Sequence, residues 1–262
     1  MNLIPLVIVL ILFLFNVPIG FSLIGGSMIY FLFMTDVMPP DLALQNFVSG
    51  LESFPLLAIP FFVMVGVVMN YSGISSRLLK FADLLVGHMR GGLAQVNVVL
   101  SALMGGISGS ANADAAMDCK ILVPEMTKRG YDPAFSAAVT AASSIIPTII
   151  PPGIMMILYC MSARVSVGKV FLAGYLPGIF ITICLMITVD ILSKKKGYGR
   201  AREKRATAKE ILIGAKESFF ALIMPFLLIG GLRFGIFTPT EGGAVAVVYS
   251  IIIGMLVYKE LK

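Results

Sequence analysis

Charged side chains, cysteine and histidine are all scarce in this sequence of 262 residues. Only 13% of the residues are charged, 58% are hydrophobic, and the mean hydropathy is +0.96. A soluble globular domain needs a larger polar surface than this composition supplies. The sequence therefore predicts an all-α polytopic membrane protein.

The few cysteines and the single histidine argue against two kinds of site. Cys119, Cys160 and Cys184 are odd in number and lack CxxC spacing, so neither a disulfide framework nor a zinc site is expected. His88 belongs to the polar face of an amphipathic segment. We favour a solvated face for it over a catalytic or ligand role.

The formal net charge of +6 does not indicate a nucleic-acid partner. Lys and Arg cluster in short connections between apolar segments, as in the cytoplasmic loops of membrane proteins. The most basic of these, 194–209, is placed on the cytoplasmic side, and the loop 35–52, which has acidic residues but no Lys or Arg, on the outer side. The N-terminus has no basic region or cleavage signal before its apolar run, which predicts a retained helix in the bilayer.

Kinked and broken transmembrane helices are predicted along the chain. The run 2–33 is interrupted at 16–20 and forms either one kinked helix or two short ones. The later segments are spans at 54–71, 171–192, 219–232 and 239–258, an amphipathic cytoplasmic helix at 75–92, a hairpin at 93–123 and a broken helix at 134–161.

The segment 93–123 predicts a re-entrant helical hairpin. Its apolar first arm, 93–104, would be about 18 Å long, which is too short to cross a core of ~30 Å. The second arm, 115–123, is shorter, and both flanks of the hairpin are basic. The sequence GGISGSANAD at 105–114 is its predicted tip.

The next segment predicts a helix that begins sharply and then breaks. Asp132 and Pro133 are a typical N-cap and first helical residue. The break lies in the sequence PTIIPPG and is caused by Pro147, Pro151, Pro152 and Gly153.

We expect the binding site at these two interruptions, because broken backbone cannot face lipid. Proline frees the carbonyl four residues earlier, here those of Ser143, Pro147 and Thr148, and the hydroxyls of Ser144 and Thr148 lie nearby. Oxygen ligands of this kind suit a hard cation, and sodium is the predicted occupant. The alternative is that both breaks are kinks packed against neighbouring helices.

The tip offers the complementary half of the site. Ser108, Ser110 and Asn112 carry oxygens for a cation or donors for a substrate. A helix restarting near Asp114 would direct its positive N-terminal end at a carboxylate. Whether Asp114 caps this helix or binds the ion stays open. For Glu241, a capping box with Thr238 is favoured over a site role.

Three motifs, SGSANADAA, PTIIPPG and GIFTPTEGGAVAVVYS, make the sequence resemble the large permease subunit of tripartite ATP-independent periplasmic (TRAP) transporters. The resemblance implies a sodium-driven elevator-type secondary transporter in the bacterial inner membrane. It also implies two partners, a small four-helix membrane subunit and a periplasmic substrate-binding protein. The implied substrates are organic acids such as C4-dicarboxylates and sialic acids, with sodium as coupling ion and no other cofactor.

The local chemistry, which points to Asp114 and Ser143, and the resemblance, which adds the hairpin tip and the broken helix, together suggest roles for individual residues. Those expected to bind substrate are Ser108, Gly109, Ser110, Asn112, Asp114, Pro151 and Gly153. Those expected to bind sodium are Ser108, Ser110, Asn112, Ser143, Ser144, Pro147 and Thr148.

Family permeases contain two inverted repeats, whereas this chain shows one repeat and the start of a second. It is therefore expected to be a fragment or to pair with another chain. The expected parts are scaffold helices with an amphipathic arm (1–92), the transport-domain hairpin and broken helix (93–162), a span with a basic loop (163–210) and the start of the second repeat (211–262).

Three other functions compete with this interpretation. The GxSG sequence ending at Gly109 matches intramembrane serine proteases, but the only histidine lies on a cytoplasmic segment, so no enzyme is expected. A non-transporting membrane scaffold subunit and a sodium/carboxylate symporter without a binding protein are the remaining alternatives.

Overall fold

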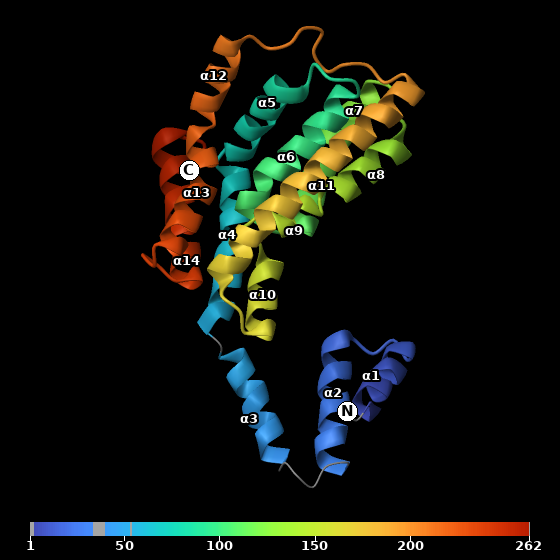
Figure 1. Ribbon diagram of the computed structural model, residues 1–262, viewed down its shortest axis with the longest axis vertical. Helices are drawn as coiled ribbons and strands as arrows, with labels where there is room; N and C mark the ends of the chain where they lie inside the picture. The colour runs from blue at the N-terminus through green and yellow to red at the C-terminus, as the bar shows by residue number, and fades with distance from the viewer. Residues whose placement is uncertain (1–2, 34–39, 53, 262) are drawn as a thin grey trace. The chain divides into compact units, whose positions relative to one another are not determined.

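A computed structural model describes residues 3–33, 40–52 and 54–261 (Figure 1). Within these ranges the regular structure is helical and no strand occurs, which confirms the all-α fold. The chain divides into two compact units, Met1–Ser53 and Phe54–Lys262.

The first unit contains the helices α1 (Ile4–Leu14), α2 (Ile19–Phe33) and α3 (Pro40–Leu51). The N-terminal apolar run therefore forms two short helices, separated at Asn16, whose φ is 58°. The prediction that 35–52 is a loop is wrong over α3, and residues 34–39 lie outside the described residues. A proline and an acidic residue in the first turn favour this helix. The prediction had used the charges of this segment only to assign it to the outer side of the membrane.

The second unit contains the remaining elements. They are η1 (Phe54–Leu57), α4 (Ala58–Tyr71), α5 (Ile74–Val86), α6 (Gly92–Ser108), α7 (Ala111–Lys128), α8 (Pro133–Ser143), α9 (Ile146–Ile149), α10 (Ile154–Ala163), α11 (Val167–Lys196), α12 (Ala208–Glu217), α13 (Phe219–Arg233), α14 (Pro239–Ile252) and the π-helical η2 (Ile253–Val257).

Several of these helices are long and apolar enough to cross a membrane. By length and composition, α11 with 30 residues and Pro239–Val257 with 19 qualify alone. Three bent pairs also qualify if each is one span: α4 with α5 (73°), α8–α9 with α10 (49°) and α12 with α13 (63°). The described residues thus contain two to five spans, in agreement with the predicted multi-pass protein.

The predicted amphipathic helix is α5, which begins after Gly73 in a left-handed conformation. Its apolar residues Ile74, Leu78 and Ala82 are fully buried. Helix α12, which packs on α5, was not predicted. The capping box between Thr207 and Glu210 is readable in the sequence and marks its start.

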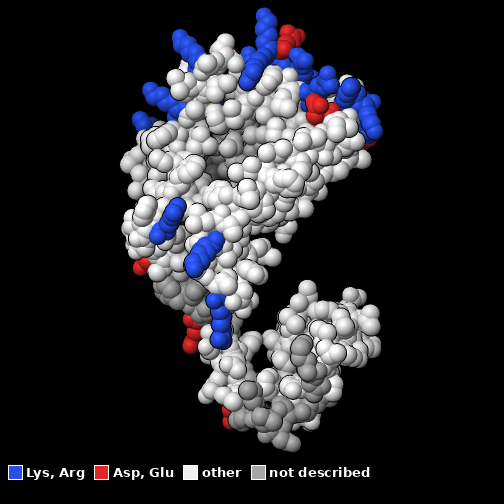
Figure 2. Space-filling model, viewed as in Figure 1, with Lys and Arg blue, Asp and Glu red and all other residues white. Residues whose placement is uncertain are grey.

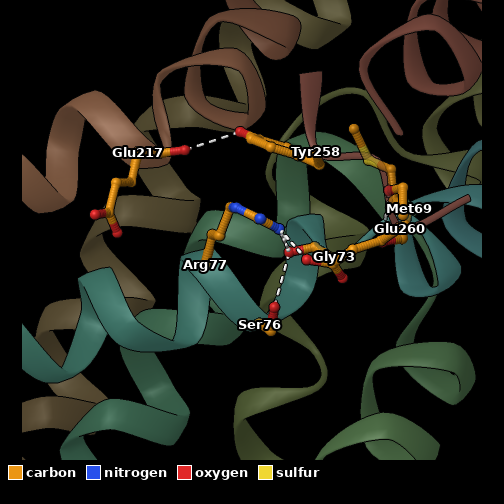
Figure 3. Close-up of polar contacts among 8 residues, drawn as sticks. Met69, Gly73, Ser76, Arg77, Glu217, Tyr258 and Glu260 are labelled. Atoms are coloured by element: carbon orange, nitrogen blue, oxygen red, sulfur yellow. Dashed lines mark hydrogen bonds and ion pairs between the residues drawn. The ribbon is translucent and has the colours of Figure 1, made fainter. Parts of the chain in front are cut away.

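Arg77 ties the α4–α5 bend to the C-terminal segment (Figure 3). Its Nη1 lies 2.8 Å from Oε1 of Glu260 and donates to the carbonyl of Gly73 at 2.9 Å. Its guanidinium lies 3.8 Å from the ring centroid of Tyr258, whose hydroxyl donates to the Glu217 carbonyl at 2.9 Å. These contacts hold α5 beside the end of α14.

Lys and Arg side chains gather at the end of the second unit where α12 and the C-terminal end of α11 lie (Figure 2). There the ring of Tyr198 stacks on that of Tyr131 at 4.5 Å, and Lys196 Nζ lies 3.0 Å from Asp132 Oδ2. Asp132 also caps α8, accepting from the Ala134 amide at 2.9 Å, as predicted. The start of α8 is thereby fixed to the end of α11.

The exposed ion pair between Lys196 and Asp132 predicts a small loss of folding stability in acid. The hydrogen bond from Lys196 and the Ala134 amide hold the pKa of Asp132 below its ordinary value of 3.8. A lowered folded-state pKa gives stability that is present above 3.8 and lost as the pH falls through the folded value. We expect Asp132→Asn to remove this part of the acid dependence of thermal unfolding between pH 5 and pH 3, whereas an unchanged profile would contradict the assignment.

Candidate functional site

The hairpin formed by α6 and α7 has a turn of only two residues. Gly109 has a φ of 55°, and Ser110 is the N-cap of α7, accepting from the Ala113 amide at 3.4 Å. The predicted tip at 105–114 is therefore helical except at these two positions, and the arms of 17 and 18 residues are longer than predicted. Helical hydrogen bonding outweighs the low helix propensity of Gly and Ser where no water is present to replace it.

Both ends of the hairpin lie at the basic end of the unit. The Gly92 amide donates to the Gly199 carbonyl at 3.3 Å, and the Tyr131 hydroxyl donates to the same oxygen at 3.3 Å. The chain therefore enters α6 and leaves α7 at one level. This arrangement agrees with the predicted re-entrant hairpin.

The helix after the hairpin is broken into α8, α9 and α10, as the prolines predict. The amides of Thr148 and Ile150 donate to Ile145 and Ile146 at 3.1 and 2.9 Å. Pro147, Pro151 and Pro152 have no amide to donate, so regular α-helix resumes only at Ile154.

The hairpin turn and the break touch each other. A Cβ atom on Gly109 would lie 2.7 Å from the carbonyl oxygen of Pro152 and 2.9 Å from Cα of Gly153. A Cβ atom on Gly105 would lie 2.8 Å from Cβ of Ile150 and 3.3 Å from Cα of Pro147. Only residues without a side chain permit this approach. The structure thus brings together the two segments that the sequence singled out.

Helix α11 shows how deep this contact lies. Its Gly174 and Gly178 face the break, since Cβ atoms there would lie 2.6 Å from Ile149 O and 3.6 Å from Ile150 N. These glycines follow Lys169 by five and nine residues, or about 8 to 14 Å of helix. They precede Lys194 by about 24 to 30 Å. The break therefore lies within the hydrophobic thickness of a bilayer.

A buried polar cluster joins the hairpin to α8. The amide nitrogen of Asn97 donates to the Thr140 hydroxyl at 2.8 Å, and the Ser143 hydroxyl donates to the Asn97 oxygen at 2.7 Å. All three residues are at most 1% exposed. Sequence reasoning missed Asn97, although a polar residue in the apolar run 93–104 was the available signal.

A second buried cluster lies inside the hairpin. The Ser101 hydroxyl is 2.8 Å from Asp114 Oδ2 and 3.4 Å from Asp118 Oδ2. The suggestion that Asp114 caps α7 is wrong, because Ser110 takes that position. The capping role of Glu241, in contrast, is confirmed by its bond from the Thr238 amide at 2.7 Å.

The predicted site residues differ in their exposure and in whether their side chains already form hydrogen bonds. Asn112 is exposed, whereas the Ser144 and Thr148 hydroxyls donate to backbone carbonyls at 2.6 and 2.7 Å. Ser108 ends α6, and its side chain lies outside what the structure describes. Pro147 and the segment 151–153 are buried at the break. Their roles in binding stay predictions.

A cavity of about 680 Å³ lies elsewhere, between α5, α6, α7 and α12 at the basic end. Its rim includes Arg129, which pairs with Glu125, and Arg202, which lies near both Asp83 and Glu210. Several of its charged groups already pair with one another, and none of the predicted site residues lines it. The meeting of the hairpin turn and the break is therefore the better candidate for the site.

Broken helices that meet inside an apolar helical bundle are typical of secondary transporters. Over residues 6–262 the chain matches the family described as the DctM component of tripartite ATP-independent periplasmic transporters, and it belongs to this family. The family resemblance found in the sequence is thereby confirmed. The chain is an integral protein of the bacterial inner membrane and not an enzyme.

Individual relatives match nearly the whole chain. It is 43% identical over 258 residues to the sialic acid TRAP transporter permease protein SiaT of Haemophilus influenzae, covering 98% of this chain and 41% of that protein. It is 39% identical to the large permease protein SiaM of Vibrio cholerae and 38% identical to the 2,3-diketo-L-gulonate large permease protein YiaN of Escherichia coli. Each match covers 94% of this chain and 57% of the relative, so the chain spans about half the length of these proteins.

Proposed function

We propose that this chain carries one hairpin and one broken helix of a sodium-coupled permease subunit that imports organic acids. The observation that supports this most strongly is the contact of the Gly109 turn with Pro152 and Gly153 at bilayer depth. Irregular backbone at that depth is typical of substrate and ion sites in secondary transporters.

Sodium is the coupling ion that the chemistry of the break favours. The donors there are hydroxyl and carbonyl oxygens from Ser144, Thr148 and the proline-rich segment 147–153, and the exposed Asn112 in the first turn of α7 is proposed to add another. Such oxygens suit a hard cation and do not select a transition metal.

An organic anion is the substrate that the helix ends favour. Helix α7 begins after Ser110, and α10 begins after Gly153, which contacts the same turn. Two helix N-termini, each with unpaired amides and a positive dipole end, therefore lie close together. The relatives are named for sialic acid, 2,3-diketo-L-gulonate and isethionate, all organic acids. A C4-dicarboxylate belongs to the same class.

The remaining parts of the proposal follow from the family. The hairpin and broken helix would move across the bilayer as an elevator domain, with a small four-helix membrane subunit and a periplasmic binding protein as partners. A symporter that needs no binding protein and a non-transporting scaffold subunit are the alternatives, and omitting the binding protein from the assay distinguishes the first of them.

Uptake by the complete transporter in proteoliposomes tests the proposal. We expect Asn112→Ala and Thr148→Ala each to raise the sodium concentration for half-maximal uptake by about tenfold, the loss of one good ligand. Thr188→Ala is the matched control, because its hydroxyl also donates to a backbone carbonyl, at 2.8 Å, but on α11 away from the break. If both site variants respond to sodium like the control, the assignment is wrong.

A further inference from the structure

We propose that Asp114, Asp118 and Ser101 form a further cation site inside the hairpin, which binds sodium apart from the turn and the break. This inference rests on the proposed function for the choice of ion. The site lies between α6 and α7, and its ligands include Asp118 and Ser101, neither of which belongs to the predicted sodium set.

The two carboxyl groups face the same point. Asp114 and Asp118 are four residues apart on α7 and thus on one face of that helix. Oδ2 of each lies within 3.4 Å of the Ser101 hydroxyl oxygen, so their separation cannot exceed the sum of the two contact distances. A cation bound beside Ser101 would therefore lie close to both.

These two carboxyl groups have fewer hydrogen-bond donors than acceptor oxygens. Ser101 has one hydroxyl hydrogen and cannot donate to both at once. Oδ1 of Asp114 and Oδ1 of Asp118 are buried and have no hydrogen-bond partner among the described residues, and the two residues are 1% and 0% exposed. Among the described residues, the hydroxyl of Ser144 also lies near Asp114, although it donates to the Thr140 carbonyl at 2.6 Å. Both serine side chains near the carboxyl groups contribute neutral hydroxyls, so neither supplies a positive charge.

No basic side chain among the described residues compensates the pair. The ion pairs of the described residues all involve other acidic groups, such as Glu125, Asp132 and Glu260. Lys120 is close in sequence but exposed, and it lines a cavity shared with α4 and α5. Burying two carboxylates without a counter-charge is strongly unfavourable, so a bound cation is required when both are ionised.

The ligand set selects the kind of cation. Every ligand is an oxygen, which excludes soft metals. Magnesium sheds its water reluctantly and suits a fully enclosed protein site poorly. Sodium fits a dry site of two carboxylates and a hydroxyl, and it is the ion proposed at the turn. Because Ser144 faces Asp114, occupancy of the two places is expected to be linked.

Sodium-dependent thermal stability of the intact protein in phosphatidylcholine nanodiscs provides the test, with sodium replaced by choline at constant ionic strength. We expect Asp118→Asn and Ser101→Ala each to raise the half-saturating sodium concentration at least tenfold. Asp190→Asn, which changes a carboxylate on α11 outside the cluster, is expected to leave it unchanged. Should Asp118→Asn not fold, Ser101→Ala provides the same comparison with all charges intact.

The outcomes separate this inference from the proposed function. If Asn112→Ala loses a sodium response and Asp118→Asn and Ser101→Ala do not, the turn site stands and this one is overturned. If only Asp118→Asn and Ser101→Ala lose it, this site stands and the assignment at the turn fails. If the thermal stability of the wild-type protein changes with pH or calcium but not with sodium, the inference is also overturned.

Discussion

Replacing Gly109 with alanine is expected to abolish uptake while leaving most of the helical structure in place. The residue has a φ of 55°, which costs a residue with a side chain about 1–2 kcal/mol. Its Cβ would also lie 2.7 Å from the Pro152 carbonyl and 2.9 Å from Gly153 Cα, both backbone atoms that cannot rotate away. The turn and the break must therefore separate. A displacement of this kind at a reacting or binding centre typically costs about 100-fold in rate.

Gly130→Ala is the matched control for this prediction. Gly130 has a φ of 83°, but a Cβ there would meet nothing within 4 Å. The control thus has a similar conformational cost without the clash, and we expect it to lower stability by about 1 kcal/mol and to keep uptake near wild type. Uptake by Gly109→Ala at the level of Gly130→Ala would show that the contact between turn and break is not needed.

Replacing Asn97 with leucine is expected to lower the free energy of unfolding by about 2–4 kcal/mol, because two hydrogen bonds are lost in a fully buried position. The change leaves the Thr140 hydroxyl without its donor, and Ser143 without the acceptor that it reaches at 2.7 Å. The single hydroxyl hydrogen of Ser143 can donate instead to the Thr140 carbonyl, 3.1 Å away, which limits the loss. Equilibrium unfolding in detergent measures the effect.

A double-mutant cycle with Ser143→Ala distinguishes a specific bond from a general packing defect. Coupling of about 0.5–3 kcal/mol is expected for groups in direct contact. Asn46→Leu, at an exposed position in α3, is the control and should change stability by less than about 0.5 kcal/mol. Additive effects of Asn97→Leu and Ser143→Ala would argue against the bond.

The hydropathy and proline pattern predicted the large elements because the bilayer leaves few alternatives for apolar sequence. The break at 147–153 and the cap at Asp132 follow from local rules and are confirmed. Helices α3 and α12 were missed because charge was used to place those segments and their helix-start signals were not weighed. The length of the hairpin tip was overestimated because Gly and Ser were interpreted as breakers, whereas a dry environment keeps them helical.

The partners of the buried polar side chains could not be predicted from the single sequence. Asn97 and Ser101 lie in a run that reads as apolar, and nothing local says that they face Thr140 and Asp114. These pairings connect residues 43 and 13 positions apart, respectively, so they depend on how α6, α7 and α8 pack. The fold was therefore more predictable than the side-chain partners within the site.

The two-residue turn of the hairpin has a mechanical consequence. A flap that opens and shuts needs a compliant loop or arms free to separate. Here the turn offers one glycine as its only hinge, and the arms are joined by the bond from Ser101 to Asp114. Bending this hairpin would break buried polar contacts on both sides of α6. Exposure of its tip to one side of the bilayer or the other is therefore expected to come from displacement of the hairpin as a stiff body.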